Sequence, residues 1–136
     1  PKDNLNKSGY PQPIIYQIMK LNWTERIPLT ESGVSRIKAI AGVYRLIYYN
    51  AQKEKYFVYY VGQAEDLNER LGQHLPDTEA SACCLEYLKG YTCYLRAAAV
   101  SQRADRDGAE VALYNHFEPP CVERIPDVDS IEINFD

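Results

Sequence analysis

The sequence contains no apolar run close to the roughly 18–20 residues that a helix needs to cross a bilayer, which excludes an integral membrane protein. It also lacks an excess of basic residues, because 15 Lys and Arg stand against 19 Asp and Glu and give a net charge of −4. Nucleic-acid binding through bulk charge is therefore excluded, whereas a local basic site is not. What the chain has in quantity is tyrosine, with twelve in 136 residues, so one domain with a real core is expected and a wholly disordered chain is not.

The four cysteines contain no CxxC pair, which argues against a zinc ribbon or a redox motif. They are Cys83, Cys84, Cys93 and Cys121. No segment has the apolar core and small-residue cleavage site of a secretory signal peptide. We therefore expect a cytoplasmic protein in which all four cysteines are free thiols and the adjacent pair is buried as small apolar groups.

The chain divides into an N-terminal extension, residues 1–35, and a domain, residues 36–136. The extension is expected to pack on the domain, with the only tryptophan, Trp23, as its anchor. Within and just after it, residues 14–19 predict a short strand and residues 34–39 a short helix.

The clearest strands are residues 42–49 and 56–62, which are rich in β-branched and aromatic residues and are separated by a polar turn. This arrangement predicts an antiparallel hairpin. Because apolar residues stand at successive positions in both strands, we expect both to be buried on two faces and central in their sheet. Residues 91–100 predict a third strand.

Three helices are predicted around these strands. Leu67, Leu71 and Leu75 form an apolar stripe over residues 65–75, and Asp66 with Glu69 resembles a capping box. Further helices are expected over residues 78–89, ending at Gly90, and 103–117, ending at Pro119 and Pro120. The tail, residues 121–136, is acidic and expected to be extended. The fold class is therefore α+β, with a small, mainly antiparallel three-stranded sheet flanked by helices.

Five polar residues stand out as candidates for chemistry: Tyr44, Tyr60, Arg70, His74 and Glu110. Arg70 and His74 are four residues apart and so share one face of a helix. An arginine fork suits phosphate oxygens and a carboxylate suits a hard divalent cation. A tyrosine hydroxyl can orient or deprotonate water when a cation lowers its pKa. Together these groups could cut a phosphodiester.

Each candidate also has a structural interpretation. The tyrosines could be strand packing residues, Arg70 could pair with Asp66 one turn earlier, and Glu110 could pair with Arg106.

The same residues carry a resemblance to a known family. Gly42-Val43-Tyr44 is followed by Tyr60-Val61-Gly62, then by Arg70 eight residues after Gly62, and by Glu110 at the start of EVALYNHFEPP. This order and spacing is similar to the GIY-YIG nuclease family, over about residues 42–120.

The resemblance implies a divalent-metal-dependent endonuclease that hydrolyses DNA phosphodiester bonds to a 5′-phosphate and a 3′-hydroxyl. Glu110 would hold Mg²⁺ or Mn²⁺, Tyr44 would act as or assist the general base, and Arg70 would hold the scissile phosphate. Tyr60 would line the same pocket, and His74 stands where the restriction-enzyme branch has a histidine in its site. Specificity would need a protein partner or a separate DNA-binding subunit.

The strand glycines have an expected role as well. Gly42 and Gly62 are expected to keep the strand surface open so that the substrate backbone can approach.

One departure keeps a second interpretation open. Val122 stands where the family has an asparagine twelve residues after the glutamate, and Asn115 or Asn134 would have to substitute for it in space. The alternative is a catalytically weak or inactive nucleic-acid-binding or adaptor module on the same fold. A purely structural scaffold accounts poorly for the polar motif residues.

Overall fold

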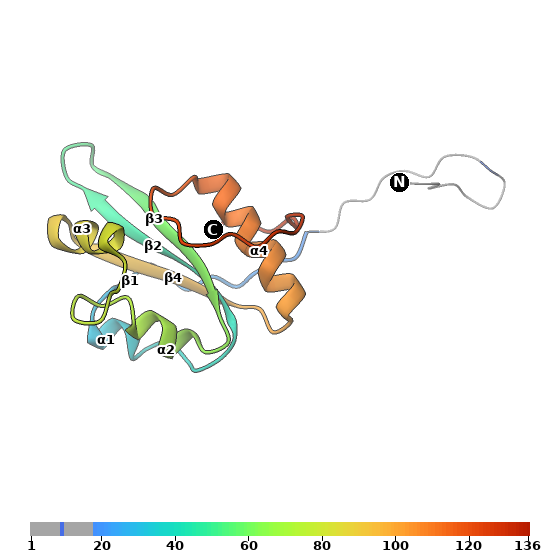
Figure 1. The fold of residues 1–136 in the computed structure, drawn as a ribbon, viewed down its shortest axis with the longest axis horizontal. Helices are drawn as coiled ribbons and strands as arrows, with labels where there is room; N and C mark the ends of the chain where they lie inside the picture. Colours follow the sequence, from blue (N-terminus) through green and yellow to red (C-terminus); the bar gives the residue numbers. More distant parts are fainter. Residues whose placement is uncertain (1–8, 10–17) are drawn as a thin grey trace.

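The computed structural model describes residue 9 and residues 18–136. In this part of the chain a four-stranded antiparallel sheet, in the order β1-β4-β2-β3, lies between helices (Figure 1). The elements are β1 (Ile27–Pro28), α1 (Glu31–Val34), β2 (Gly42–Asn50), β3 (Lys55–Ala64), α2 (Leu67–Gly72), α3 (Ala82–Gly90), β4 (Cys93–Ala99) and α4 (Arg103–Phe117). The predicted α+β class is confirmed, with one strand more than expected.

The predicted hairpin is present as β2 and β3, with Tyr44 paired to Gly62. Strand β2 is central and buried on both faces from Gly42 to Ile47, as expected. Strand β3 lies at the edge of the sheet, so the prediction that both strands are central is wrong for β3. Its apolar residues are buried because the chain after α4 covers this edge, where the Cys121 N–H donates to the Tyr59 carbonyl at 3.0 Å.

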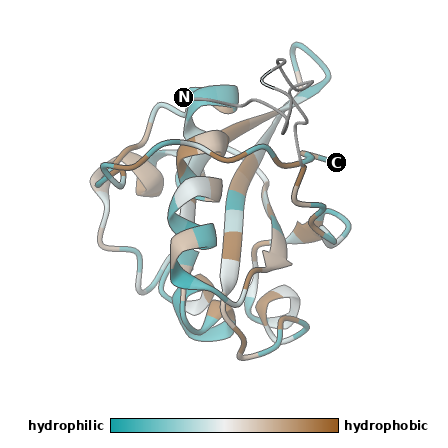
Figure 2. Cartoon of the chain, turned by 90° about the vertical axis from the view of Figure 1, so that its right-hand side faces the viewer, coloured by the Kyte–Doolittle hydropathy of each residue, from teal (hydrophilic) through white to brown (hydrophobic). Residues whose placement is uncertain are grey.

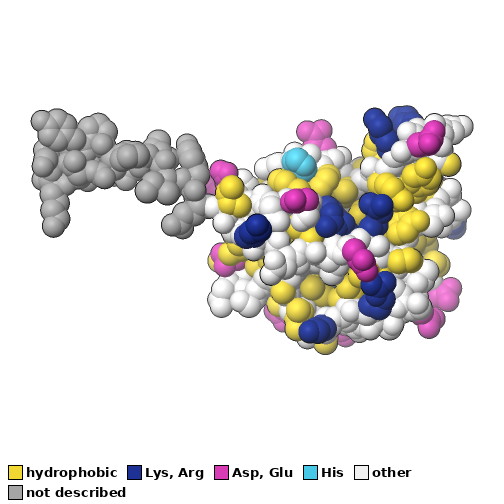
Figure 3. Space-filling model, turned by 180° about the vertical axis from the view of Figure 1, so that it is seen from behind, with side chains coloured by type: hydrophobic (Ala, Val, Ile, Leu, Met, Phe, Trp, Pro, Cys, Tyr) yellow, Lys and Arg dark blue, Asp and Glu magenta, His cyan; other side chains and the backbone are white. Residues whose placement is uncertain are grey.

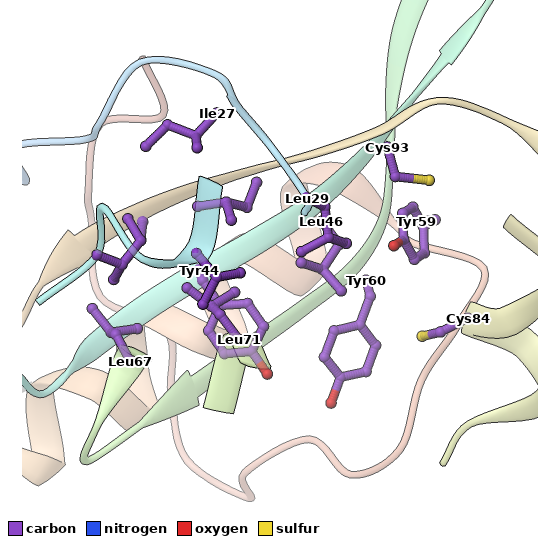
Figure 4. Close-up of a cluster of buried hydrophobic side chains, with 14 of the residues drawn as sticks. Ile27, Leu29, Tyr44, Leu46, Tyr59, Tyr60, Leu67, Leu71, Cys84 and Cys93 are labelled. Atoms are coloured by element: carbon purple, nitrogen blue, oxygen red, sulfur yellow. The ribbon is translucent and has the colours of Figure 1, made fainter. Parts of the chain in front are cut away.

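A β-bulge in β3 decides which tyrosines share a face of the sheet. Leu46 pairs with Tyr60 but Ile47 pairs with Val58, so Tyr59 is an extra residue in the ladder. As a result, Tyr59 and Tyr60 both belong to the same core as Leu46, although neighbours in a regular strand point to opposite faces (Figure 4).

Each face of the sheet has its own apolar core. The first core lies under α1, α2 and α3 and includes Val34, Leu67 and Leu71. The second lies under α4 and joins Ala109 and Leu113 of that helix to the valines of β2 and β3. The helices that will carry the candidate site residues are thus held to the sheet from opposite sides.

The C-terminal tail (residues 121–136) passes across α4 (Figure 2). The Ile131 N–H donates to the Gly108 carbonyl at 3.3 Å, and a Cβ on Gly108 would meet the Ile131 side chain at 2.8 Å. The glycine therefore lets the tail lie directly on the helix. Farther along, the Trp23 Nε1–H donates to the Asn134 carbonyl at 2.9 Å, which ties the segment just before β1 to the tail.

Helix boundaries follow the caps. Asp66 accepts a hydrogen bond from the Glu69 N–H at 3.0 Å, which confirms the predicted start of α2, although the helix ends at Gly72. Helix α3 begins only after Ser81, whose hydroxyl accepts from the Cys84 N–H, because that residue supplies the cap. Helix α4 spans its predicted residues, 103–117.

Two expectations near the N-terminus change. The predicted helix at 34–39 is instead α1, which starts earlier because Thr30 is its cap. The predicted strand at 14–19 falls largely outside the described residues, and Met19 forms a single parallel bridge with Ile133. None of the helices in the described part of the chain is long and apolar enough to cross a membrane.

The prediction of four free thiols is wrong for two of them. Cys83 at the start of α3 and Cys121 after α4 form a disulfide, with Cα atoms 5.6 Å apart, whereas Cys84 and Cys93 are free and buried. The partners are separated by 38 residues, and only the tertiary fold brings them together.

Reducing this disulfide should lower the free energy of unfolding. For a separation of 38 residues the chain-entropy model gives a loss of about 4 kcal/mol. Urea unfolding with and without dithiothreitol measures it, and a Cys83→Ala/Cys121→Ala double variant should not respond to the reductant. An unchanged midpoint in the wild-type protein would contradict this prediction.

Candidate active site

Tyr44 and Tyr60 lie side by side on β2 and β3, with ring centroids 6.1 Å apart and hydroxyl groups directed to the same side (Figure 4). The pairing of Tyr44 with Gly62 is sterically required. A Cβ on Gly62 would meet the Tyr44 hydroxyl oxygen at 2.5 Å and its ring carbon at 2.6 Å. Only glycine therefore lets the Tyr44 ring lie flat on β3.

The expected role of the two strand glycines is consequently wrong. The space above Gly62 holds the Tyr44 ring, and a Cβ on Gly42 would meet the Ala98 carbonyl oxygen at 2.2 Å. Both glycines make room for atoms of the protein itself rather than for a substrate backbone.

Helix α2 brings Arg70 to the same place. Its Nη2 lies 3.4 Å from the Tyr60 hydroxyl oxygen, and its Nη1 donates to Gln73 at 3.0 Å. The alternative pairing with Asp66 is not formed, because that side chain is occupied as the cap of α2. The Arg70 guanidinium is partly exposed, so an anion from solution can reach it.

Glu123 joins this cluster and was not predicted from the sequence. Its Oε1 accepts from the Tyr60 hydroxyl at 2.6 Å and from Arg70 Nη2 at 3.1 Å. Burial, together with the Glu123 carboxylate, raises the pKa of Tyr60 above its ordinary value. The neighbouring Val122, which occupies the family's asparagine position, is exposed. The family spacing directs attention to position 122, and no local pattern indicates position 123.

His74 is buried beside both tyrosines. Its Nε2 lies 2.8 Å from the Tyr44 hydroxyl oxygen, and its ring centroid is 5.0 Å from that of Tyr60. On the other side, Nδ1 lies 2.6 Å from Glu79 Oε1. Burial lowers the pKa of His74, against the influence of Glu79, and burial raises the pKa of Tyr44 well above its ordinary value. Glu79 was also missed, because a lone glutamate before a helix carries no recognisable signal.

Glu110 stands on α4, on the other side of the sheet from α2, and borders an open cleft of about 520 Å³. Gln63, Arg103, Asp107 and Arg124 also line this cleft. Glu110 is only 7% exposed, and burial, with a contribution from Asp107, raises its pKa to about 7.

Glu110 is not held by the ion pair that the sequence left open. Arg106 donates instead to the carbonyls of Val100 and Ser101 and to Gln63. Burial is the main cause that raises the pKa values of both Glu110 and Tyr44. The structure thus joins Tyr44, Tyr60, Arg70 and His74 by contact, whereas Glu110 borders its own cleft beside α4.

A hard divalent cation fits Glu110. Mg²⁺ is commonly held by one or two carboxylates and keeps several of its waters, which needs open space at the carboxylate. Glu110 borders such space, and among residues 18–136 its carboxylate forms no salt bridge. A buried carboxylate without a cationic partner is a suitable ligand for an added cation.

A second group of ligand atoms suits a metal less well. His74, Glu79 and Cys84 place one donor atom each within 4.8 Å of one another. However, burial raises the pKa of the Cys84 thiol to about 12, and His74 Nδ1 is already bonded to Glu79. The geometry observed here is that of a hydrogen-bonded group.

Neither asparagine considered as a substitute reaches the site. The Asn134 side chain bonds to the backbone of Leu21, accepting at 2.6 Å and donating at 2.9 Å. Asn115 is exposed on α4, beside the tail. From the segment after α4, Glu123 bonds to Tyr60 and Arg70, and Arg124 lines the cleft at Glu110.

The face of the molecule in Figure 3 is electrostatically mixed. It intersperses Lys and Arg with Asp, Glu and apolar side chains, in keeping with the net charge of −4. Contact with a polyanion would thus depend on single, placed guanidinium groups rather than on a continuous basic surface.

The sheet order, the hairpin with its two motif tyrosines and the helix that follows define a GIY-YIG-like fold. Similar solved structures are of the GIY-YIG N-terminal endonuclease domain of UvrC from Thermotoga maritima. An asparagine-to-alanine and a tyrosine-to-phenylalanine point mutant, each bound to its catalytic divalent cation, both align with a TM-score of 0.52 and 18% identity over 68% of this chain and 93% of theirs. The same domain bound to magnesium aligns at 0.50 and 18%, over 65% and 90%.

The likeness is one of structure rather than of sequence. No protein-family model matches this sequence, and no curated protein is significantly similar to it. At 18% identity the alignments establish the fold.

The buried Glu110 should make stability pH-dependent when metal is absent. Its pKa is raised from 4.5 to about 7, so the folded state binds its proton more tightly than the unfolded state. The Glu110 contribution to stability should fall as pH rises from about 4.5 to 7 and then level off, by up to about 3 kcal/mol.

Urea unfolding with chelator at pH 5, 6, 7 and 8 measures this slope. Glu110→Gln should flatten it, whereas Glu132→Gln, at an exposed tail position, should leave it unchanged. Equal slopes for the wild type and Glu110→Gln would show that Glu110 does not titrate in this range.

Proposed function

We propose that this chain is a divalent-metal-dependent endonuclease that hydrolyses phosphodiester bonds in DNA. The observation that carries the proposal is the convergence of two tyrosine hydroxyls and the Arg70 guanidinium on one side of the hairpin. The buried carboxylate of Glu110, which forms no salt bridge within residues 18–136, supports it from the open cleft beside α4. This is the equipment that phosphodiester hydrolysis needs, and it lies on a fold shared with endonuclease domains that bind a catalytic divalent cation.

Arg70 is the proposed phosphate ligand. Its guanidinium fork matches phosphate oxygens and would stabilise the charge that develops on phosphorus as water attacks. Glu123 now occupies this fork, with its carboxylate oxygen 3.1 Å from Nη2. A phosphate that binds Arg70 would therefore replace the Glu123 carboxylate. Tyr60, which also bonds to Glu123, would then be released to line the pocket.

Tyr44 is the proposed acceptor of the proton from the attacking water. Its hydroxyl points toward the same space as that of Tyr60, and His74 Nε2 at 2.8 Å is positioned to receive its own proton. Glu110 would hold a divalent cation, which supplies Lewis-acid stabilisation of charge on the phosphate oxygens when bound. Mg²⁺ and Mn²⁺ both suit a carboxylate and water ligand set.

A second candidate function, a nucleic-acid-binding or adaptor module without activity, is favoured by one observation. Glu123 neutralises Arg70, and Val122 offers no polar group where the family has an asparagine. On this alternative, the protein would bind nucleic acid or a protein partner without cleaving DNA.

Cleavage of supercoiled plasmid DNA at low salt with Mg²⁺ or Mn²⁺ tests the main proposal. We expect nicking by the wild type, and losses on the order of 10²–10³-fold in Arg70→Ala and Tyr44→Phe. Glu110→Ala should lose activity at least as severely and no longer respond to metal.

Matched controls come from the same residue types away from the site. Tyr49 is a strand tyrosine that packs on Tyr56, and Arg36 is paired with Glu25. The Tyr49→Phe and Arg36→Ala variants should both cleave DNA like the wild type. Folded wild-type protein that binds DNA but leaves duplex and branched substrates intact would favour the adaptor alternative.

Glu123→Gln should tighten substrate binding. The change removes the negative charge on Arg70 but keeps a side chain of similar size, so KM for DNA should fall several-fold at low salt. Steady-state cleavage kinetics measure the effect, and Glu132→Gln controls for the change in net charge. A KM equal to that of the control variant would show that Glu123 does not compete for Arg70.

A further inference from the structure

A buried chain of three side chains runs behind the candidate site, and its last member has no assigned role. The Tyr44 hydroxyl oxygen lies 2.8 Å from His74 Nε2, and His74 Nδ1 lies 2.6 Å from Glu79 Oε1. The second oxygen of Glu79 accepts the Ser81 N–H at 3.0 Å. The side chains of His74 and Glu79 are 1% and 4% exposed, so solvent does not compete for these bonds.

The contacts determine which ring nitrogen carries the proton. A carboxylate only accepts hydrogen bonds, so Nδ1 must donate to Glu79. Burial lowers the pKa of His74, which keeps the ring neutral and leaves Nε2 with a lone pair. The Tyr44 hydroxyl therefore donates to His74.

We propose that Glu79 is a positioning residue that fixes His74 as the Nδ1–H tautomer, so that Nε2 can accept the Tyr44 proton during catalysis. This inference rests on the proposed endonuclease activity. Glu79 touches neither substrate nor metal in this scheme and acts only through His74.

The proton transfers balance. Water loses a proton to the Tyr44 oxygen as its own oxygen bonds to phosphorus, and the Tyr44 O–H proton passes to His74 Nε2. The bond from phosphorus to the leaving oxygen breaks, and that oxygen is protonated by bulk water. The resulting imidazolium is stabilised by the Glu79 carboxylate until it returns its proton to solvent.

Proton transfer from Tyr44 to His74 explains how a neutral tyrosine can act as the base. Burial raises the pKa of Tyr44 well above its ordinary value, so the tyrosine is not an anion at neutral pH. A neutral hydroxyl can take a proton from water only if it passes its own proton on, and His74 is within reach to receive it. Without a fixed tautomer, His74 could donate to Tyr44 and the transfer would stop.

Among the groups around His74, Glu79 is the one that determines which ring nitrogen carries the proton. Arg70 from α2 lowers the His74 pKa and Glu123 from the tail raises it, and the hydroxyls of Tyr44 and Tyr60 face it from β2 and β3. Cys84 from α3 is a neutral thiol, because burial raises its pKa to about 12. Among these groups, Glu79 is the one hydrogen-bonded to Nδ1.

Glu79→Gln tests the proposal with almost no change in volume. The amide can present its NH₂ to Nδ1, which favours the opposite tautomer and makes Nε2 a donor to Tyr44. We expect kcat to fall on the order of 100-fold or more with little change in KM. Glu79→Asp retains a carboxylate and should recover most of kcat, and thermal unfolding checks that both variants are folded.

A second readout does not depend on activity. Long-range ¹H–¹⁵N spectra of metal-free, ¹⁵N-histidine-labelled protein should show the bare nitrogen of His74 at Nε2 in the wild type and Glu79→Asp, and at Nδ1 in Glu79→Gln. His116, exposed on α4, is the only other histidine and should be identical in all three.

A wild-type ring with the bare nitrogen at Nδ1 would overturn the proposal. So would wild-type kcat in a folded Glu79→Gln variant whose tautomer has reversed. If the wild type cleaves no DNA, the proposed function fails on its own, and the tautomer spectra still decide whether Glu79 fixes His74.

Discussion

The contact between the Tyr44 ring and Gly62 determines the rest of the site. It requires the register in which these two residues face each other, because any side chain at position 62 would displace the ring. With this register, Tyr60 lies two residues before Gly62 and so faces the same side as Tyr44, next to Arg70, and the bulge adds Tyr59 to that face. The ring also carries the Tyr44 hydroxyl to His74. A single steric requirement thus brings two strands and the end of a helix into one polar cluster.

The polar groups of that cluster already have hydrogen-bond partners without a ligand. Arg70 has Glu123 as its counter-ion, and the Glu79 carboxylate accepts the Nδ1–H of His74. Glu110 is the exception, since burial holds its pKa near 7 and its cleft is open. The molecule therefore has one place that favours an added cation and one where an incoming anion must replace a carboxylate already present.

Local pattern was sufficient for much of the fold and for part of the site. Apolar runs predicted the hairpin, Asp66 predicted the start of α2, and the resemblance to the GIY-YIG family implied that Tyr44, Tyr60 and Arg70 would meet. Strand β1 escaped detection because it is two residues long and contains Pro28, which is tolerated only at a sheet edge.

The missed residues have a common physical reason. Glu123 is 63 residues from Tyr60, and Cys83 is 38 residues from Cys121, so tertiary folding alone makes them neighbours. Glu79 is close to His74 in sequence, yet its role depends on burial, which turns an ordinary glutamate into a fixed hydrogen-bond acceptor. Periodicity and spacing indicate which residues are neighbours along a helix or strand. The contacts of Glu123, Cys121 and Glu79 are tertiary contacts, so these patterns do not indicate them.

The disulfide also sets how the Glu123 side chain can move. Cys121 is bound covalently to α3 and lies only two residues before Glu123, so the backbone at Glu123 can travel at most about 7 Å from a fixed pivot. Its exchange with another anion on Arg70 is then a short swing about Cys121 and leaves the tail bound across α4. The movement of residues 122 and 123 is therefore limited by the disulfide at Cys121.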